Sequence, residues 1–184
     1  MPDYGESSYR RFLQGDKTAL ENLLCAYSDA LVRFAYSYVK SSAIAEDVVA
    51  DSFAALLVKK RNIPDDDHLR AYLYKTTRNG CMNYLRRYRR DVPLCDVENV
   101  LESGDTQSTL WHSERDKLLY RCMQTLPKDY REVLQLSYID GFSIPEVCDM
   151  MGKNTKQVYN LLARAKSALK ELLQKEGITH EDIL

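Results

Sequence analysis

The stretch at residues 72–90, YLYKTTRNGCMNYLRRYRR, carries six basic side chains and no acidic one, although the formal net charge of the chain is only −1. Basic side chains neutralise phosphates, and tyrosines set among them offer flat faces on which unstacked bases can lie. Asn79 and Asn83 can both donate and accept hydrogen bonds, as a reader of base edges must. The pattern predicts a surface for single-stranded nucleic acid, and the alternative is an ordinary solvated basic face.

A helix must present these residues. Leu69, Leu73, Thr77 and Cys81 recur at four-residue steps and define a buried face, with Tyr72 at its edge. The opposite side is left to solvent. Its candidate nucleic-acid contacts, with the edge tyrosine included, are Tyr72, Lys75, Arg78, Asn79, Asn83 and Arg86.

A second candidate surface lies at residues 126–173. Ser143 with Glu146 forms a capping box for a short helix, Gly152 ends that helix, and Asn154 with Gln157 can cap the next one. Two helices joined by a tight turn are typical of a helix-turn-helix, whose second helix enters the major groove. A plain helical hairpin in a bundle is the alternative.

The second of these helices has the layout of a recognition helix. Val158, Leu162, Ala165 and Leu169 define its buried face, so the polar side chains point away from the core. Asparagine, glutamine and arginine pair with base edges in the major groove. The candidate contacts are Lys156, Gln157, Tyr159, Asn160 and Arg164.

Two carboxylates, Asp47 and Asp51, share one face of a third expected helix, AIAEDVVADSFAALLVKK. Like charges at positions i and i+4 repel each other, so a basic group outside the helix is expected to compensate for them. The face is then either a solvated acidic surface near a helix N-terminus or a docking surface for a basic partner. A catalytic or metal-binding pair ranks last, because no histidine lies nearby.

Little else in the chain suggests catalysis. His68, His112 and His180 are scattered without ligand spacing, so we expect no catalytic residue, no metal site and no cofactor. The five cysteines are odd in number and widely spaced, which suits neither disulfides nor a zinc site. We expect reduced, mostly buried thiols.

The composition favours helices, because there are seven glycines and five prolines in 184 residues. We therefore predict an all-α protein of two small helical domains, at residues 1–90 and 110–184, joined by an acidic flexible linker at 91–109. No apolar run is long enough to span a bilayer and no secretory signal is evident, so we expect no membrane insertion and a cytoplasmic location.

Together, the two halves resemble the extracytoplasmic-function (ECF) sigma factors of the sigma-70 family. AEDVVADSFAALL is similar to the family's polymerase-binding segment in region 2, and LRAYLYKTTRNGCMNYLRR to the segment that opens the minus-ten element. The segment from LPKDYREVL to ALKELL resembles the minus-thirty-five reader of region 4, a helix-turn-helix. Three such segments occur in the family's order around an acidic linker.

The resemblance implies a subunit that binds core RNA polymerase through Asp47 and Asp51 and aids promoter opening. Asn79 would contact a flipped base of the non-template strand, with the loop at 62–69 helping to capture it, and the region 4 surface would bind duplex at the minus-thirty-five element. An anti-sigma factor is a further implied partner. The chain departs from the family at Tyr72, where tryptophan is usual, and at Gln157, Tyr159 and Leu161, where threonine and basic residues are common. A different minus-thirty-five preference is expected.

The alternative function is a dimeric helix-turn-helix regulator that binds duplex DNA without acting as a polymerase subunit. That hypothesis leaves the basic and aromatic stretch at 72–90 and the Asp47 and Asp51 face unexplained.

Overall fold

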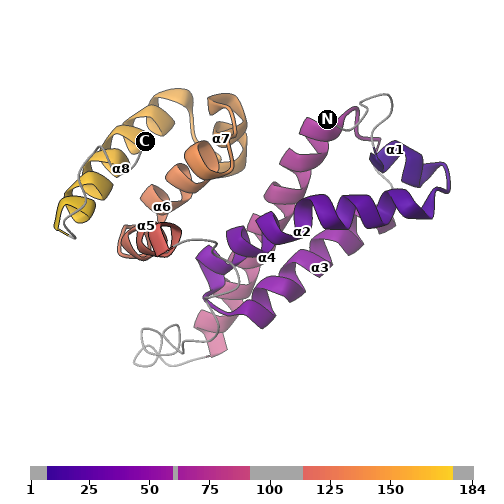
Figure 1. The fold of residues 1–184 in the computed structure, drawn as a ribbon, viewed down its shortest axis with the longest axis horizontal. Helices are drawn as coiled ribbons and strands as arrows, with labels where there is room; N and C mark the ends of the chain where they lie inside the picture. Colours follow the sequence, from indigo (N-terminus) through magenta and orange to yellow (C-terminus); the bar gives the residue numbers. More distant parts are fainter. Residues whose placement is uncertain (1–7, 60–61, 92–113, 176–184) are drawn as a thin grey trace. The chain divides into compact units, whose positions relative to one another are not determined.

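The computed structural model describes residues 8–59, 62–91 and 114–175, and the chain divides into two compact units, Met1–Thr106 and Gln107–Leu184. The described residues of both units form helices joined by short connections, and none of them forms a strand (Figure 1). The predicted all-α class is confirmed. The predicted linker falls mostly outside the described residues, so the domain boundaries stay a prediction.

Unit 1 contains α1 (Ser8–Leu13), α2 (Lys17–Val39), α3 (Ser42–Lys59) and α4 (Asp66–Asp91). The last three pack against one another pairwise, and α1 packs on α2 and α4. Asp16 caps α2 by accepting hydrogen bonds from the Thr18 and Ala19 main-chain N–H groups at 2.9 and 3.3 Å. At the centre of the bundle the Phe34 ring lies 4.9 Å from the Tyr74 ring, centroid to centroid.

The predicted buried faces of unit 1 are confirmed at most positions. Leu69, Leu73, Thr77 and Cys81 are all buried on one side of α4. On α2, Leu23, Leu31 and Phe34 are buried, whereas Leu24 is 36% exposed.

Unit 2 contains α5 (Glu114–Gln124), α6 (Lys128–Leu134), a π-helical turn at Gln135–Ile139, α7 (Ile144–Met151) and α8 (Thr155–Lys175). The helices α5, α6 and α7 all pack against α8. Val133, Leu136, Val147, Val158 and Ala165 are fully buried among them. The long α8 therefore organises the unit and keeps one side free.

The predicted caps of α7 and α8 are confirmed. The Glu146 carboxylate accepts the Ser143 main-chain N–H at 2.8 Å and the Ser143 hydroxyl at 2.6 Å. Gly152 ends α7 in the left-handed conformation with φ 63. Asn154 and Gln157 then bond reciprocally, each side-chain oxygen accepting the other's main-chain N–H at 2.9 Å. The capping box sets where α7 starts, Gly152 sets where it ends, and the Asn154–Gln157 pair sets where α8 starts.

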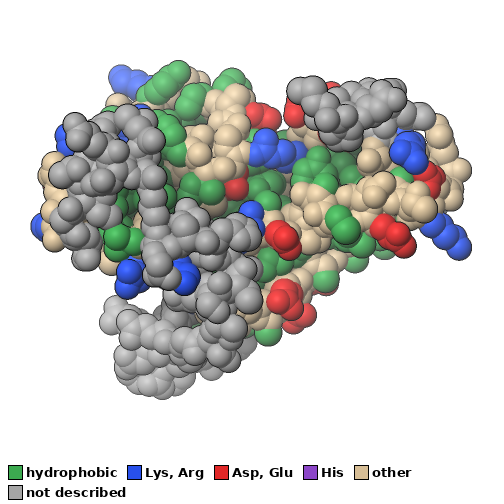
Figure 2. Space-filling model, viewed as in Figure 1, with side chains coloured by type: hydrophobic (Ala, Val, Ile, Leu, Met, Phe, Trp, Pro, Cys, Tyr) green, Lys and Arg blue, Asp and Glu red, His purple; other side chains and the backbone are tan. Residues whose placement is uncertain are grey.

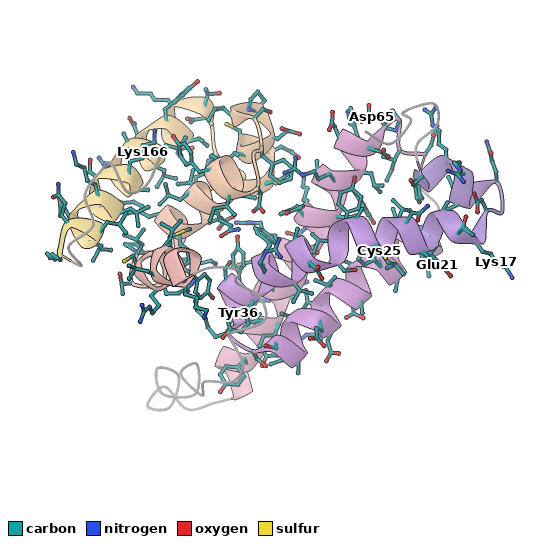
Figure 3. All side chains as sticks on the ribbon, viewed as in Figure 1. Lys17, Glu21, Cys25, Tyr36, Asp65 and Lys166 are labelled. Carbon is teal, nitrogen blue, oxygen red and sulfur yellow. The ribbon has the colours of Figure 1, made fainter. Side chains whose placement is uncertain are left out.

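None of the helices in the described ranges combines the length and apolar character needed to cross a membrane. Of the cysteines, Cys81 and Cys122 are buried and Cys148 is half-buried, whereas Cys25 is exposed on α2 (Figure 3). The expected burial thus fails at Cys25, and Cys95 lies outside the described residues.

Candidate nucleic-acid interface

A groove of about 690 Å³ runs between α3 and α4 in unit 1. The wall from α3 contributes Asp47 and Asp51, with Ile44, Val48 and Ser52 around them. The wall from α4 contributes Tyr72, Lys75, Thr76, Asn79, Gly80, Asn83, Tyr84 and Arg87, and Lys59 lies at the end of α3. The acidic face and the basic, aromatic face predicted from sequence as separate surfaces therefore meet in one groove.

The depth of this groove depends on a close approach of α3 and α4. A Cβ atom on Gly80 would lie 2.8 Å from Val48 Cγ1, so only glycine allows this spacing. One helical turn away, buried Thr77 donates its hydroxyl to Ser52 Oγ at 3.1 Å, and Ser52 donates to the Val48 carbonyl at 2.8 Å. Small residues and one buried hydrogen bond thus hold the two walls together.

Four of the six candidate contacts on α4 line the groove: Tyr72, Lys75, Asn79 and Asn83. Their spacing of three or four residues puts them on one helical face. Arg78 is half-buried and Arg86 is exposed, and neither lines the groove. Arg86 instead donates to Asn83 Oδ1 at 3.1 Å. The side chain of Arg90 lies outside the described residues.

Sequence reasoning missed five polar or aromatic members of the groove: Ser52, Lys59, Thr76, Tyr84 and Arg87. The signal was present for three of them, since residues 76, 80, 84 and 87 continue the face that starts at residue 72. Burial raises the pKa of Tyr84 above its usual value, with a smaller contribution from Tyr88. Its ring lies 6.0 Å from the Tyr88 ring in a stacked arrangement.

The groove is mixed in charge. Asp47 and Asp51 are exposed and face a space that Lys59, Lys75 and Arg87 also line. In Figure 2 acidic side chains are spaced along the visible side of unit 1, with hydrophobic and polar surface between them. Phosphates would be attracted to one wall and repelled by the other, so the charges favour a nucleic-acid strand along α4 over one that fills the groove.

Unit 2 has a shallow hollow of about 250 Å³ on the outer side of α8, lined by Lys153, Gln157, Asn160, Leu161 and Arg164. Three of the five predicted contacts on α8 are therefore brought together. Lys156 and Tyr159 are exposed but lie beside the hollow rather than in it. The predicted buried residues Val158, Leu162 and Ala165 are buried, and Leu169 is half-buried.

Two lysines of unit 2 interact with neighbouring side chains. Lys153 Nζ lies 3.0 Å from Asp129 Oδ2 on α6, which fixes the turn before α8. Lys166 lies over the Tyr138 ring, 4.6 Å from its centroid (Lys166 is labelled in Figure 3). Sequence reasoning did not predict Lys153 as part of the surface. In the described residues no group of three or more histidine, cysteine or acidic side chains could hold a metal ion.

Two family models match the chain: Sigma-70 region 2 at residues 23–91, and Sigma-70, region 4 at residues 116–169. The chain belongs to the sigma-70 family. The groove lies within the first match and the helix-turn-helix within the second. As a sigma factor, the protein directs core RNA polymerase to promoters in transcription initiation.

The similarity of this sigma factor to known ECF sigma factors places it in the ECF group. It is 25% identical over 163 residues to the ECF RNA polymerase sigma factor SigM of Bacillus subtilis, covering 88% of this chain and 99% of the relative. It is 25% identical over 175 residues to the ECF RNA polymerase sigma-E factor of Escherichia coli, covering 89% and 91%.

Solved structures share the fold. The sigma factor RpoE of Bartonella quintana, in co-crystals with the anti-sigma factor NepR, matches with a TM-score of 0.70 and 25% identity, covering 84% of this chain and 96% of that one. CnrH, solved in complex with the cytosolic domain of CnrY, matches with a TM-score of 0.64 and 23% identity, covering 94% and 99%.

Proposed function

We propose that this sigma factor reads promoter DNA with two surfaces, one for separated strands on α4 and one for duplex on α8, and docks on core RNA polymerase through Asp47 and Asp51. The observation that carries the proposal is the groove of unit 1, where a basic and aromatic wall faces an acidic one. Each wall suits a partner of opposite charge: DNA phosphates on α4 and a basic polymerase surface on α3.

On α4 we assign strand contacts to Tyr72, Lys75, Arg78, Asn79, Asn83 and Arg86. The four that line the groove form its inner row, and Arg78 and Arg86 extend the basic surface outside it. Asn79 is the proposed contact for a flipped base of the minus-ten element. Its exposed amide offers both a donor and an acceptor.

On α8 we assign major-groove contacts to Lys156, Gln157, Tyr159, Asn160 and Arg164. All five are exposed, and they occupy the N-terminal half of the helix, as in other helix-turn-helix proteins. Gln157 also caps α8, so its amide is already committed in part and Asn160 and Arg164 are left as the main readers of bases. They would read the minus-thirty-five element.

Sigma factors are non-catalytic initiation factors, and we infer that this one performs no chemistry and needs no cofactor of its own. Its proposed location is the cytoplasm, where polymerase and promoters are found. An anti-sigma factor is a proposed partner, because RpoE of Bartonella quintana was crystallised with one. Co-expression with the product of each adjacent gene should yield one stable complex that no longer binds core polymerase. If no product binds, this partner is wrong.

Run-off transcription with sigma-free core polymerase and the promoter of the protein's own gene tests the function. We expect transcript only when core polymerase and the protein are both present, and none from a template with a scrambled minus-ten element. The dimeric regulator makes the opposite prediction, which is tight and specific duplex binding by the protein alone without transcript. No observation favours that alternative.

A further inference from the structure

The N-terminal helix α1 lies outside the region 2 match, which begins at residue 23. It nevertheless contacts the segment that leads into α4. Arg10 Nη2 donates to the Pro64 carbonyl oxygen at 2.6 Å, across 54 residues of sequence. Pro64 belongs to residues 62–65, directly before the first turn of α4. A side chain of α1 thus holds the main chain directly before α4, which forms one wall of the groove.

The residues on either side of Pro64 are also held in place. Ile63 is buried, with 7% of its surface exposed. Asp65 (labelled in Figure 3) accepts the His68 main-chain N–H at 2.9 Å and pairs with His68 Nδ1 at 2.7 Å. These bonds lower the pKa of the Asp65 carboxyl, so it stays ionised at the N-terminus of α4. Residues 63–65 are therefore anchored by burial, by Arg10 and by the first turn of α4.

The helix α1 also packs directly on α4. Tyr9 is 1% exposed, and its ring lies 6.5 Å from the Phe12 ring. Burial raises the Tyr9 pKa, with a smaller contribution from Tyr72. Tyr72 lines the groove. The helix α1 therefore contacts both the segment at 62–65 and α4 itself.

We propose that Arg10 is a positioning residue for promoter opening, which holds residues 62–65 in place directly before α4, the helix that carries the proposed strand contacts. The inference rests on the proposed strand contact at α4. A preorganised segment loses less conformational entropy when it captures a base, so it binds that base more tightly. Duplex recognition by α8 does not depend on this contact.

Arg10→Ala tests the proposal, with Arg11→Ala as its matched control. Arg11 lies in the same helix and makes an equally short bond, 2.6 Å from its Nη2 to Asp16 Oδ2, but that bond stays at the start of α2. Both arginines are exposed, so both variants should fold. The holoenzyme is assembled with each variant, and permanganate reactivity of promoter thymines is measured beside filter binding of the closed complex.

We expect Arg10→Ala to reduce promoter opening about fivefold, the factor that corresponds to losing one net hydrogen bond, with closed-complex binding unchanged. Arg11→Ala should open the promoter like the wild type. Hydrogen–deuterium exchange should speed up at residues 62–69 in Arg10→Ala alone, since the anchored segment is released.

The proposal would be overturned by normal opening in Arg10→Ala, by equal loss in Arg11→Ala, or by unchanged exchange at residues 62–69. An equal fall in closed-complex binding and opening would also overturn it, because that pattern indicates a general loss of structure. These outcomes are separate from failure of the proposed function, in which the wild-type protein itself yields no run-off transcript.

Discussion

The two asparagines in the groove differ in what they already bind. Asn83 Oδ1 accepts a hydrogen bond from Arg86, whereas in the described parts of the chain no group bonds to the Asn79 side chain. The Asn79 amide therefore has its donors and its acceptor available for a base, while Asn83 offers mainly its donors. This difference is the reason why we propose Asn79, rather than Asn83, as the main contact for an exposed base.

Asn79→Ala and Asn160→Ala should fail at different steps. Asn160→Ala, or Arg164→Ala beside it, removes a reader of duplex and should weaken closed-complex binding by about 1–3 kcal/mol, with altered preference in the minus-thirty-five element alone. Asn79→Ala should leave that binding nearly intact and reduce permanganate reactivity of the opened thymines. If Asn79→Ala opens the promoter normally, or Arg164→Ala changes only opening, the assignment of the two surfaces is wrong.

The walls of the groove depend on how closely two helices pack. Gly80 on α4 faces Val48 on α3 with no room for a methyl group between them. In an isolated helix, alanine is favoured over glycine by roughly 0.5–1 kcal/mol. At Gly80 the clash opposes that preference, so the fold retains glycine in the middle of a 26-residue helix.

Gly80→Ala should destabilise unit 1 by about 1–3 kcal/mol, because α3 and α4 must move apart. Val48→Ala provides the matched test, since it removes the clashing methyl groups. In a double-mutant cycle followed by thermal unfolding, Gly80→Ala should cost less in the Val48→Ala background than in the wild type. Equal costs in both backgrounds would contradict the close contact.

The contribution of the Asp16 cap of α2 to the stability of the fold should fall at acidic pH. Hydrogen bonds from the Thr18 hydroxyl and from Arg11 lower the Asp16 pKa to about 2. A carboxyl whose folded pKa is depressed stabilises the fold above its unfolded pKa, near 3.8, and loses that contribution as the pH falls through about 2. The stability difference between wild type and Asp16→Asn should therefore shrink between these two values. An NMR titration midpoint of Asp16 near 4 would contradict the cap geometry.

Charge is balanced over the chain as a whole, with a formal net charge of −1. Locally, however, basic and acidic side chains gather on different surfaces, and each surface suits a different kind of partner. DNA requires basic surface, and too few phosphates are neutralised by a nearly neutral protein for tight binding at physiological salt. The acidic wall of α3 adds repulsion at the groove itself. Binding of a basic polymerase surface to that wall would remove the repulsion and favour strand binding on α4.

Reversing both charges, Asp47→Lys with Asp51→Lys, should abolish co-purification with core polymerase. Both residues are exposed, so helical content by circular dichroism should not change. The control is Glu21→Lys with Asp29→Lys, which makes the same charge change at exposed positions on α2 (Glu21 is labelled in Figure 3). Retained polymerase binding by the Asp47 and Asp51 variant, or equal loss in the control, would refute the docking surface.

Several features of this protein follow from its sequence because they depend on neighbours a few residues apart. The caps at Ser143 and Asn154, the turn at Gly152 and the buried row from Leu69 to Cys81 all rest on three- and four-residue spacings. The order of the sigma-70 segments can likewise be read directly from the sequence. Helices, their buried faces and the family could all be predicted on this basis.

Other features arise where distant segments meet, and local spacing carries no information about them. The crossing of α3 and α4 brings Asp47 into the same groove as Asn79, and Gly80 against Val48 sets how close the walls come. Packing of α1 brings Arg10 to Pro64. Each contact depends on the angle and separation at which whole helices pack, which are set by side-chain volumes summed over the entire interface.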